Sequence, residues 1–407
     1  MGTRSAVAPV KNQSLWRLPQ MRQLLAISLL GFTSFCLTLA AVPTWAHAGG
    51  VAESAAGLPT TVMLASTVLT QAAVPRLVTR FGVGRTLAAG LVALGAPAPF
   101  CALSHQLAVL LPVAAVRGCG FAVLTVVGAT LTATVAPPDR HGESVGLYGL
   151  AIAVPNLLGI PAGVALTQLG GFGWVASGAA IPVLAVPLAL SLGRSIERNA
   201  DNSGATVSSS LSARRTVAVV LAPAMVLLVV TLAGGGLITY LPIQRPSGVF
   251  ATVGLLLFGA CAALARWRVG AIADRVGTTV LLPVSVGAGA VGVLLVAAGL
   301  AAGSSADALV LVGAVAAGAG YGAVQNLTLV VAFLRAGPGR SATASAVWNA
   351  AFDSGTAIGA VAIGATAAAG LGVPGAFAAS AGLVAVSLPL AWWMRPAANR
   401  ARCPSAR

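Results

Sequence analysis

The sequence predicts an all-α polytopic membrane protein, with twelve transmembrane helices arranged as two pseudo-symmetric six-helix bundles. The first observation is composition: of the 407 residues, 57% are hydrophobic and only 8% are charged. A soluble protein carries about 25% charged residues, so the lipid bilayer must be the solvent for most of this chain. The second observation is a series of long apolar segments, and the third is a similarity between the two halves of the sequence.

Each apolar segment is long enough to cross a membrane, which takes about 20 residues in a helix. Six segments lie near residues 24–46, 58–79, 86–104, 107–135, 144–167 and 173–193. Six more lie near residues 216–241, 248–267, 279–301, 307–334, 342–368 and 374–394. The first segment follows a basic N-terminus, as a leader peptide does, but its length and the many similar segments after it indicate a retained span.

A polar stretch separates the two sets of six. It runs from Ser195 to Arg215 and is rich in serine and asparagine, a composition typical of flexible linkers. We therefore predict an N-terminal six-helix bundle over residues 1–194, a cytoplasmic linker over 195–215, and a C-terminal six-helix bundle with a short basic tail over 216–407.

The basic residues predict how the helices are oriented. With both termini in the cytoplasm, 21 of the 23 lysines and arginines fall in cytoplasmic loops or termini, whereas Arg245 lies in an outer loop and Arg117 lies within a span. Membrane proteins carry this excess on the cytoplasmic side. The net charge of +15 is spread in short runs between spans, which argues against a nucleic-acid partner. We expect a multi-pass protein of the cell (cytoplasmic) membrane.

The two halves of the chain repeat each other. At an offset of 200 residues, Gly118–Phe121 matches Gly318–Tyr321, and Pro138 and Arg140 match Pro338 and Arg340. Both offsets that we find, 200 and 195 residues, are close to half the chain length. Two six-helix repeats of the same orientation explain this similarity, and proteins built in this way hold their binding site near the middle of the membrane, where the repeats meet.

The matching loop after the second helix of each half carries a recognisable pattern. In the second half it reads Gly-x-x-x-Asp-Arg-x-Gly, while the first half keeps its arginines and its last glycine but has Thr79 in place of the aspartate. This pattern resembles the loop signature of the major facilitator superfamily of secondary transporters. Arg117 is similar to a fourth-helix arginine of that family. Residues 159–163 resemble a Gly/Pro motif of its proton-coupled exporters.

The resemblance implies that these loops gate the protein. The fifth helix begins at the cytoplasmic face, so its positive dipole end faces the loop after the eighth helix, where Asp274 can interact with it and with Arg140. Such contacts exist only while the cytoplasmic side is closed, so they bias the inward–outward equilibrium. The alternative is that the loop charges only fix topology. The predicted gating residues are Gly270, Asp274, Arg275, Gly277, Arg80, Gly82, Arg85 and Arg140.

Asp353 and Arg117 are the two charged residues that the sequence places near the middle of the bilayer. With a rise of about 1.5 Å per residue, Asp353 lies roughly 18 Å from the cytoplasmic Ser341, and Arg117 lies roughly 15 Å from the outer end of its helix. Ionisable groups at this depth are costly and mark functional sites, so we predict that both residues couple proton or substrate movement. Alternatively, Asp353 hydrogen-bonds Asn349 and Ser354 and holds the eleventh helix against the second.

Other polar or aromatic side chains at similar depth are predicted to line a substrate cavity, although bonding between helices would also explain them. They are Tyr321, Gln325, Asn326, Trp348, Asn349, Gln71, Ser34 and Asn156. The three histidines lie at segment ends and the five cysteines form no CxxC pair. We therefore expect neither a metal site nor a disulfide framework.

The resemblance and the deep charges together predict a secondary active transporter of small organic molecules, a proton-coupled exporter that works by alternating access. An importer or a facilitator of a small metabolite is the alternative. The sequence has no GxxxxGK[ST] loop, so ATP drive is not expected. We expect the proton gradient as the drive, no cofactor, and a monomer. A single carboxylate in an almost apolar cavity favours amphipathic or weakly basic substrates.

Two further classes of function are less compatible with the sequence. A membrane-embedded enzyme requires paired catalytic groups, such as a histidine with a carboxylate or two aspartates. The deep part of the spans contains one aspartate and one arginine, so we expect no enzymatic activity. A receptor or scaffold without transport is the third class, and the internal repeat argues against it.

Overall fold

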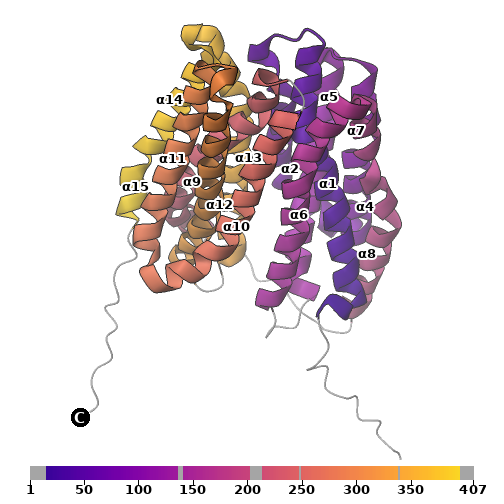
Figure 1. Cartoon of the computed structure of the whole chain (residues 1–407). Helices are drawn as coiled ribbons and strands as arrows, with labels where there is room; N and C mark the ends of the chain where they lie inside the picture. Colours follow the sequence, from indigo (N-terminus) through magenta and orange to yellow (C-terminus); the bar gives the residue numbers. More distant parts are fainter. Residues whose placement is uncertain (1–14, 136–140, 202–212, 247–248, 338–339, 395–407) are drawn as a thin grey trace, which may run out of the picture.

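The computed structural model describes residues 15–135, 141–201, 213–246, 249–337 and 340–394, and within these residues it contains helices and no strand. We call residues 15–201 the first half and residues 213–394 the second half. Figure 1 shows the first half, indigo to magenta, beside the second half, orange to yellow.

The helices of the first half are η2 (Leu15–Arg17), α1 (Pro19–Ala48), η3 (Glu53–Ala55), α2 (Leu58–Gln71), α3 (Val74–Phe81), α4 (Val83–Gly95), η4 (Ala98–Leu103), α5 (Leu107–Val135), α6 (His141–Gly170), α7 (Phe172–Gly178), η6 (Ile181–Ala185) and α8 (Val186–Asp201). Those of the second half are α9 (Ala213–Gln244), α10 (Val249–Val276), α11 (Thr278–Ala301), η7 (Ser304–Ala306), α12 (Asp307–Ala336), α13 (Ser341–Thr366), η8 (Ala367–Leu371), α14 (Gly372–Val386) and α15 (Leu388–Trp393).

In the described residues, ten segments are long and apolar enough to cross a membrane, and a bent pair of helices makes an eleventh. One of the ten, Thr343–Trp393, has 51 residues. As one straight helix it would measure roughly 75 Å, more than twice the thickness of a bilayer core. Its backbone breaks at Gly370, where φ is 104°, and the chain then returns along α14 (Figure 1). Counted as two crossings, this segment brings the total to the predicted twelve.

The second span differs from its prediction as one continuous helix over 58–79. The chain bends by 58° between the segment that ends at Gln71 and the helix α3. Pro75 lies in the first turn of α3. Its ring has no N–H group and clashes with the preceding turn, so it favours the start of a new helix over the continuation of the old one. Gln71 is therefore the last residue of an interrupted transmembrane helix.

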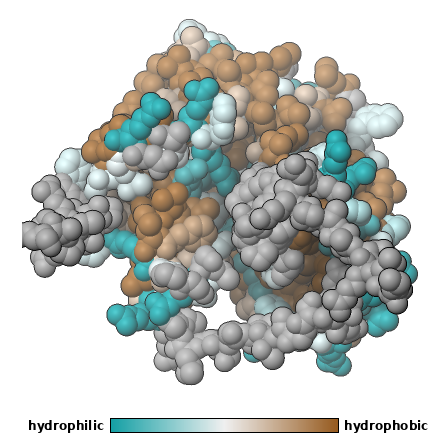
Figure 2. Space-filling model, turned by 90° about the horizontal axis from the view of Figure 1, so that it is seen from below, coloured by the Kyte–Doolittle hydropathy of each residue, from teal (hydrophilic) through white to brown (hydrophobic). Residues whose placement is uncertain are grey.

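Both ends of the described chain, Leu15 and Met394, lie at the same end of the bundle, which we call the terminal end (Figure 1). Arg80, Arg275 and Arg335 lie there, in the last turns of α3, α10 and α12, whereas Arg245 lies at the opposite end, where it pairs with Asp307 over 2.9 Å. Viewed from the terminal end, hydrophilic residues are spread among hydrophobic ones (Figure 2). Trp16, at the start of the described chain, is 56% exposed, as expected of a tryptophan at a membrane interface. The predicted cytoplasmic location of this end stays a prediction.

Two interfaces join the halves in a symmetric manner. Helix α2 packs against α13, and α6 packs against α10. Each interface thus pairs the second span of one half with the fifth span of the other.

The repeated glycines found in the sequence have the same packing role in both halves. A Cβ atom at Gly118 of α5 would overlap the carbonyl of Met63 in α2, and one at Gly318 of α12 would overlap the carbonyl of Phe258 in α10. Two residues later, Gly120 contacts α4 and Gly320 contacts α11 in the same manner. Small residues let these backbones approach closely, which is how helices pack in lipid.

Gly82 and Gly277 also have matching roles, at the turns after α3 and α10. Their φ angles are 82° and 89°, which place both residues in a region that a side chain disfavours. Each glycine ends one helix and caps the next. The last glycine of the loop pattern is therefore explained by backbone geometry.

We predict that Gly318→Ala destabilises the protein, because its Cβ would lie 2.9 Å or less from backbone atoms of Phe258, and overpacking costs about 1–3 kcal/mol. The control is Gly287→Ala in α11, where a Cβ meets nothing within 4 Å and where alanine favours the helix by about 1 kcal/mol. Thermal unfolding in detergent, followed by tryptophan fluorescence, should show a lower Tm for the first variant only. Equal shifts in both variants would contradict this packing.

Candidate functional site

Asp353 lies at the contact between the two halves. It occupies the middle of α13, and its side chain is 7% exposed. Gln71, at the end of α2, donates a hydrogen bond from Nε2 to Oδ2 of Asp353 over 3.1 Å. This bond joins the eleventh span to the second, as in the predicted alternative, but its partner is Gln71 and not the predicted Asn349 or Ser354. The bond also joins a titratable carboxylate to the other half of the protein.

The rest of this interface is tightly packed. Thr61 of α2 donates a hydrogen bond to the carbonyl oxygen of Ala357 over 2.6 Å, and Gly57 lies directly against the carbonyl of Ala360. Asp353, Ala357 and Ala360 follow each other at helical spacing on one face of α13. The bond to Gln71 is the member of this row nearest to the terminal end.

The opposite end of the molecule is closed by contacts between the halves. The Tyr240 hydroxyl of α9 donates to the carbonyl oxygen of Glu53 over 2.9 Å, and Gln244 donates to the Glu53 carboxylate. Gln168 of α6 donates to the carbonyl oxygen of Pro246 over 3.3 Å. Within the described residues, hydrogen bonds that join the two halves begin at this end and continue as far as Gln71. The described part of the interface from Gln71 to the terminal end has none.

Arg117 does not meet Asp353. It is 2% exposed inside the first half, where it donates from Nε to the carbonyl oxygen of Leu94 and from Nη1 to Oγ1 of Thr38, each over 3.0 Å. Its Nη2 donates to the carbonyl and the hydroxyl oxygens of Ser34. Four hydrogen bonds thus tie α5 to α1 and α4. The role of Arg117 in coupling stays a prediction, and its geometry is that of a helix-packing group.

Ser34 belongs to this same cluster. Its hydroxyl is fully buried and donates to the carbonyl oxygen of Ala179 over 2.5 Å. This position in the interior of the first half differs from the predicted one in the wall of a substrate cavity. The sequence shows that Ser34 is deep in its span, but the direction in which it points depends on the packing of α1.

The second half contains, within a span, an arginine that the sequence prediction places in a cytoplasmic loop. Arg266 lies within the span Val249–Gly270 and is half-buried. Its Nη1 donates to Oε1 of Gln325 over 3.0 Å, and Asn326 donates to its backbone carbonyl over 2.9 Å. The loop pattern that begins at Gly270 was the available signal, since Arg266 lies one helical turn before it.

Tyr321 lies near this arginine in the second half. It is one turn before Gln325 on α12 and is 8% exposed. Gly234 of α9 makes room for its ring, because a Cβ there would overlap it. We call Tyr321, Gln325 and Arg266, contributed by α10 and α12, the polar cluster.

Aromatic rings surround the cluster. The Tyr321 ring lies 5.1 Å from that of Phe258 and 6.2 Å from that of Phe352, which in turn stacks on Trp348 at 5.8 Å. The Trp348 indole donates to Oγ1 of Thr328 over 3.0 Å, so it ties α13 to α12. These rings place apolar surface next to Tyr321.

Asn349 and Asn156, both half-buried, bond to their own helices. Asn349 donates to the carbonyl and the hydroxyl oxygens of Ser345, and Asn156 donates to the carbonyl oxygen of Ile152 over 2.9 Å. Neither contacts the polar cluster through a hydrogen bond in the described residues. Their predicted place in a cavity wall stays a prediction.

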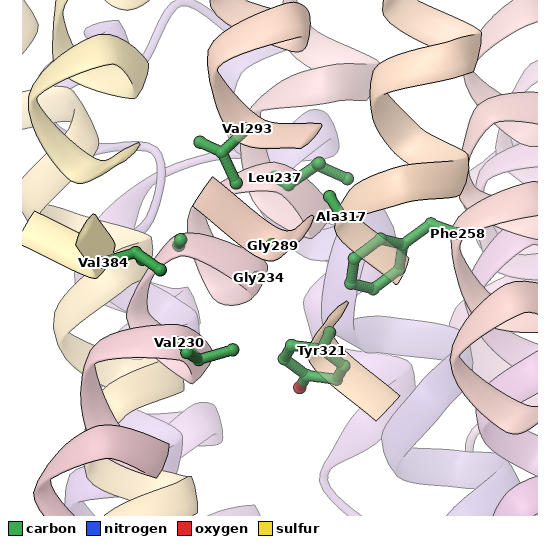
Figure 3. A pocket seen from close by; sticks show the side chains of 10 residues that line it. Val230, Gly234, Leu237, Phe258, Gly289, Val293, Ala317, Tyr321 and Val384 are labelled. Atoms are coloured by element: carbon green, nitrogen blue, oxygen red, sulfur yellow. The ribbon is translucent and has the colours of Figure 1, made fainter. Parts of the chain in front are cut away.

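A small apolar cavity lies on the other side of Tyr321, inside the second half (Figure 3). Its volume is about 10 Å³, room for about one water molecule, so it is too small for a substrate. The Tyr321 ring borders it, and the hydroxyl points away from Leu237 and Val293 (Figure 3). The polar end of Tyr321 is thus directed out of this cavity.

The gating loops lie at the terminal end. In the first half, Arg85, Arg194 and Glu197 line a hollow of about 460 Å³ between the turn after α3 and helix α8. Glu197 reaches the turn, since a Cβ at Gly82 would lie 2.6 Å from its Oε1. The loop itself has Thr79 where the pattern has an aspartate, and the Glu197 carboxylate of α8 lies near this loop.

For the other predicted gating residues, the structure shows no hydrogen bond or ion pair with the other half in its described part. Arg80 stacks on the ring of Phe81 at 5.3 Å, and Arg275 is exposed. Arg140 and the side chain of Asp274 lie outside the described residues, so the predicted latch between them stays a prediction. The described part of the chain contains no group of three or more possible metal ligands.

Comparisons with known proteins agree with this architecture. Residues 24–360 match the family model of the Major Facilitator Superfamily, whereas no curated protein matches the chain. Among solved structures, the fold is similar to a bacterial homologue of the human lysosomal transporter Spinster in an inward-facing, unoccupied conformation. The TM-score is 0.72 at 14% identity, with 93% of this chain and 97% of that chain covered.

Two other solved structures have the same fold. The nucleoside transporter NupG has a TM-score of 0.69 at 12% identity, with 92% of this chain and 98% of that chain covered. A D-xylose–proton symporter has a TM-score of 0.72 at 14% identity, with 94% and 98% covered. At these identities the similarity concerns the fold alone, and it agrees with the predicted all-α fold of two bundles.

We predict that Arg117→Met lowers the unfolding free energy by about 3 kcal/mol, because it removes hydrogen bonds from a charged group and leaves the Leu94 carbonyl without its donor. Exposed Arg76 supplies the control, since Arg76→Met should leave the Tm unchanged. Thermal unfolding in detergent compares the two. An Arg117→Met protein of normal stability that fails to transport would assign Arg117 to coupling instead.

Proposed function

The chain belongs to the major facilitator superfamily, and on this basis we propose that it is a proton-coupled secondary transporter that exports small organic molecules by alternating access. The observation that carries the proposal is the hydrogen bond from Gln71 to Asp353, between the two halves. Of the four carboxylate side chains that the structure describes, Asp353 is the one in the middle of a transmembrane helix. Intramembrane ionisable groups of this kind typically carry protons or bind ions.

The charge of Asp353 is linked to the contact between α2 and α13. An ionised carboxylate only accepts hydrogen bonds, whereas a protonated one also donates. Gln71 donates to Asp353 in this structure, and protonation weakens this bond, because a neutral carboxyl oxygen is a weaker acceptor than a carboxylate oxygen. A change in protonation therefore changes an interaction between the halves, and an interaction that differs between two conformations shifts their populations.

The contacts at the opposite end support an inward-facing assignment for this structure. Glu53 is bonded there to two residues of α9, so that end is closed across the halves. With the terminal end in the cytoplasm, as the basic residues predict, the binding region opens toward the cytoplasm. Closure of the terminal end and release of the Glu53 contacts would give the outward-facing state.

The export direction is supported by the resemblance of residues 159–163 to an exporter motif. In this structure Gly163 lies directly against the carbonyl of Leu37, and Gly159 lies against Cys36. The stretch therefore lets α6 pack closely on α1, where proline and glycine also permit bending. Import and facilitated diffusion are the other outcomes of the experiment below.

We propose that the protein works as a monomer in the cell membrane, with both termini in the cytoplasm and without a cofactor. The bonds of Arg266 to Gln325 and of Gln71 to Asp353 are formed within one chain, so a second copy is not needed to complete them. The proton gradient supplies the energy, and the partners of the chain are its small-molecule substrate and the bilayer.

We predict that Asp353→Asn abolishes proton-driven accumulation, because the amide cannot release a proton, while exchange of substrate across the membrane continues. Proteoliposomes of both orientations should be tested with a panel of organic cations, neutral compounds and anions, while an internal dye reports pH. In the parent protein, a transported compound moves together with protons, and the active orientation gives the direction. With the Asp353→Asn variant, the substrate should reach only equal concentrations on the two sides of the membrane.

The matched control is Asp307→Asn, the same chemical change at the end of the molecule where Asp307 pairs with Arg245. It should keep proton-driven transport. If Asp353→Asn accumulates substrate as well as the parent does, Asp353 is not the coupling group, and the α2–α13 bond is a packing contact only.

A further inference from the structure

The two deep arginines of this protein are bonded very differently. Arg117 donates four hydrogen bonds to protein groups. Arg266 lies within a transmembrane span, and its guanidinium donates one, to the neutral oxygen of Gln325. Within the described part of the chain, no carboxylate pairs with it. A guanidinium has five N–H donors, so most of those of Arg266 have no protein partner.

These N–H groups are also accessible. In the described part of the chain, four residues have a side-chain atom that is both buried and without a hydrogen bond: Ser28, Thr239, Arg245 and Thr252. Arg266 is not one of them, so its unbonded nitrogens reach the molecular surface. An uncompensated cation in a membrane span is costly, and such groups usually face a water-filled cavity or bind an ion. If Arg266 served only to tie α10 to α12, its donors would be expected to be used as those of Arg117 are.

The neighbours of Arg266 suit an anion with an apolar body. Gln325 holds one end of the guanidinium, and the planar fork of arginine matches both oxygens of a carboxylate. Tyr321 lies one turn before Gln325 on the same helix. Phe352 is half-buried, and its ring lies 6.2 Å from the Tyr321 ring and offers apolar contact area. The site therefore combines one cation with an aromatic wall.

We propose that Arg266, positioned by Gln325 and flanked by Tyr321, binds the carboxylate of an amphipathic organic anion that the protein carries. This proposal rests on the proposed transport function and names its substrate class. It differs from the weakly basic substrates expected from the sequence, because that expectation had placed Arg266 in a loop. Asp353 stays bonded to Gln71 and does not neutralise Arg266, so the anion and the proton have separate sites.

The test uses three compounds of the same aromatic body and different charge: naphthoate, naphthamide and naphthylmethylamine. Their binding to the purified full-length protein in detergent is measured by calorimetry and by the shift in Tm. Naphthoate should bind and raise the Tm, while the neutral amide and the amine should not. Arg266→Gln should weaken naphthoate binding by about 10- to 100-fold, the loss expected for hydrogen bonds to a charged group.

Arg268 provides the matched control, because it is exposed and stacks on Trp267 at 4.4 Å, two residues further along the same helix. Arg268→Gln should bind naphthoate as the parent does. Arg266→Lys keeps the charge but loses the planar fork, so it should retain part of the binding. It also serves as the folded comparison if Arg266→Gln proves unstable.

Three results would overturn the proposal: no binding of naphthoate to the parent protein, equal binding of naphthamide, or unchanged naphthoate binding in Arg266→Gln. These outcomes are independent of the proton-coupling experiment. If Asp353→Asn retains proton-driven accumulation while Arg266→Gln loses naphthoate binding, the coupling group is wrong and the anion site stands. The reverse combination leaves the proton-coupled function standing and removes the carboxylate site.

Discussion

A carboxylate in the middle of a membrane helix must be given a partner, and the fold supplies one from the other half of the protein. Asp353 accepts a hydrogen bond from Gln71 over 3.1 Å, at the point where α2 ends and the chain bends by 58°. Interrupted helices are common at the sites of transporters, since their ends leave polar groups that a continuous helix would not offer. The interface of α2 with α13, the break before Pro75 and the proposed coupling all depend on this one contact.

The two arginines that lie within spans differ in how many of their N–H groups are bonded by the protein. Arg117 is enclosed by α1, α4 and α5 and is bonded by oxygens of Ser34, Thr38 and Leu94, so it stabilises the first half. Arg266 is bonded by Gln325 and keeps free donors beside an aromatic wall. The second half thus contains the polar cluster and the first half contributes Gln71. The two halves of the symmetric fold therefore differ in where their buried polar groups lie.

The sequence predicts the spans, the repeat and the family well, because hydropathy and glycine spacing act locally along the chain. Gly118 and Gly318 were matched by offset alone, and both allow the same close helix approach. The sequence does not predict the direction in which a side chain points, because an apolar transmembrane helix has no polar face that would distinguish its sides. Ser34 was expected in a cavity and lies in the interior of its half. Arg266 was counted as a loop residue because the apolar run ends there, although α10 continues to Val276.

The central claim is that the protonation of Asp353 controls the contact between the halves, and a distance measurement tests it directly. Spin labels at Arg76→Cys in α3 and Arg335→Cys in α12, in a background without the native cysteines, report the separation of the halves at the terminal end. We predict that the distance distribution changes between acidic and alkaline pH, and that Asp353→Asn removes this change. A pH response that persists unaltered in Asp353→Asn, or its absence in the parent protein, would contradict the account.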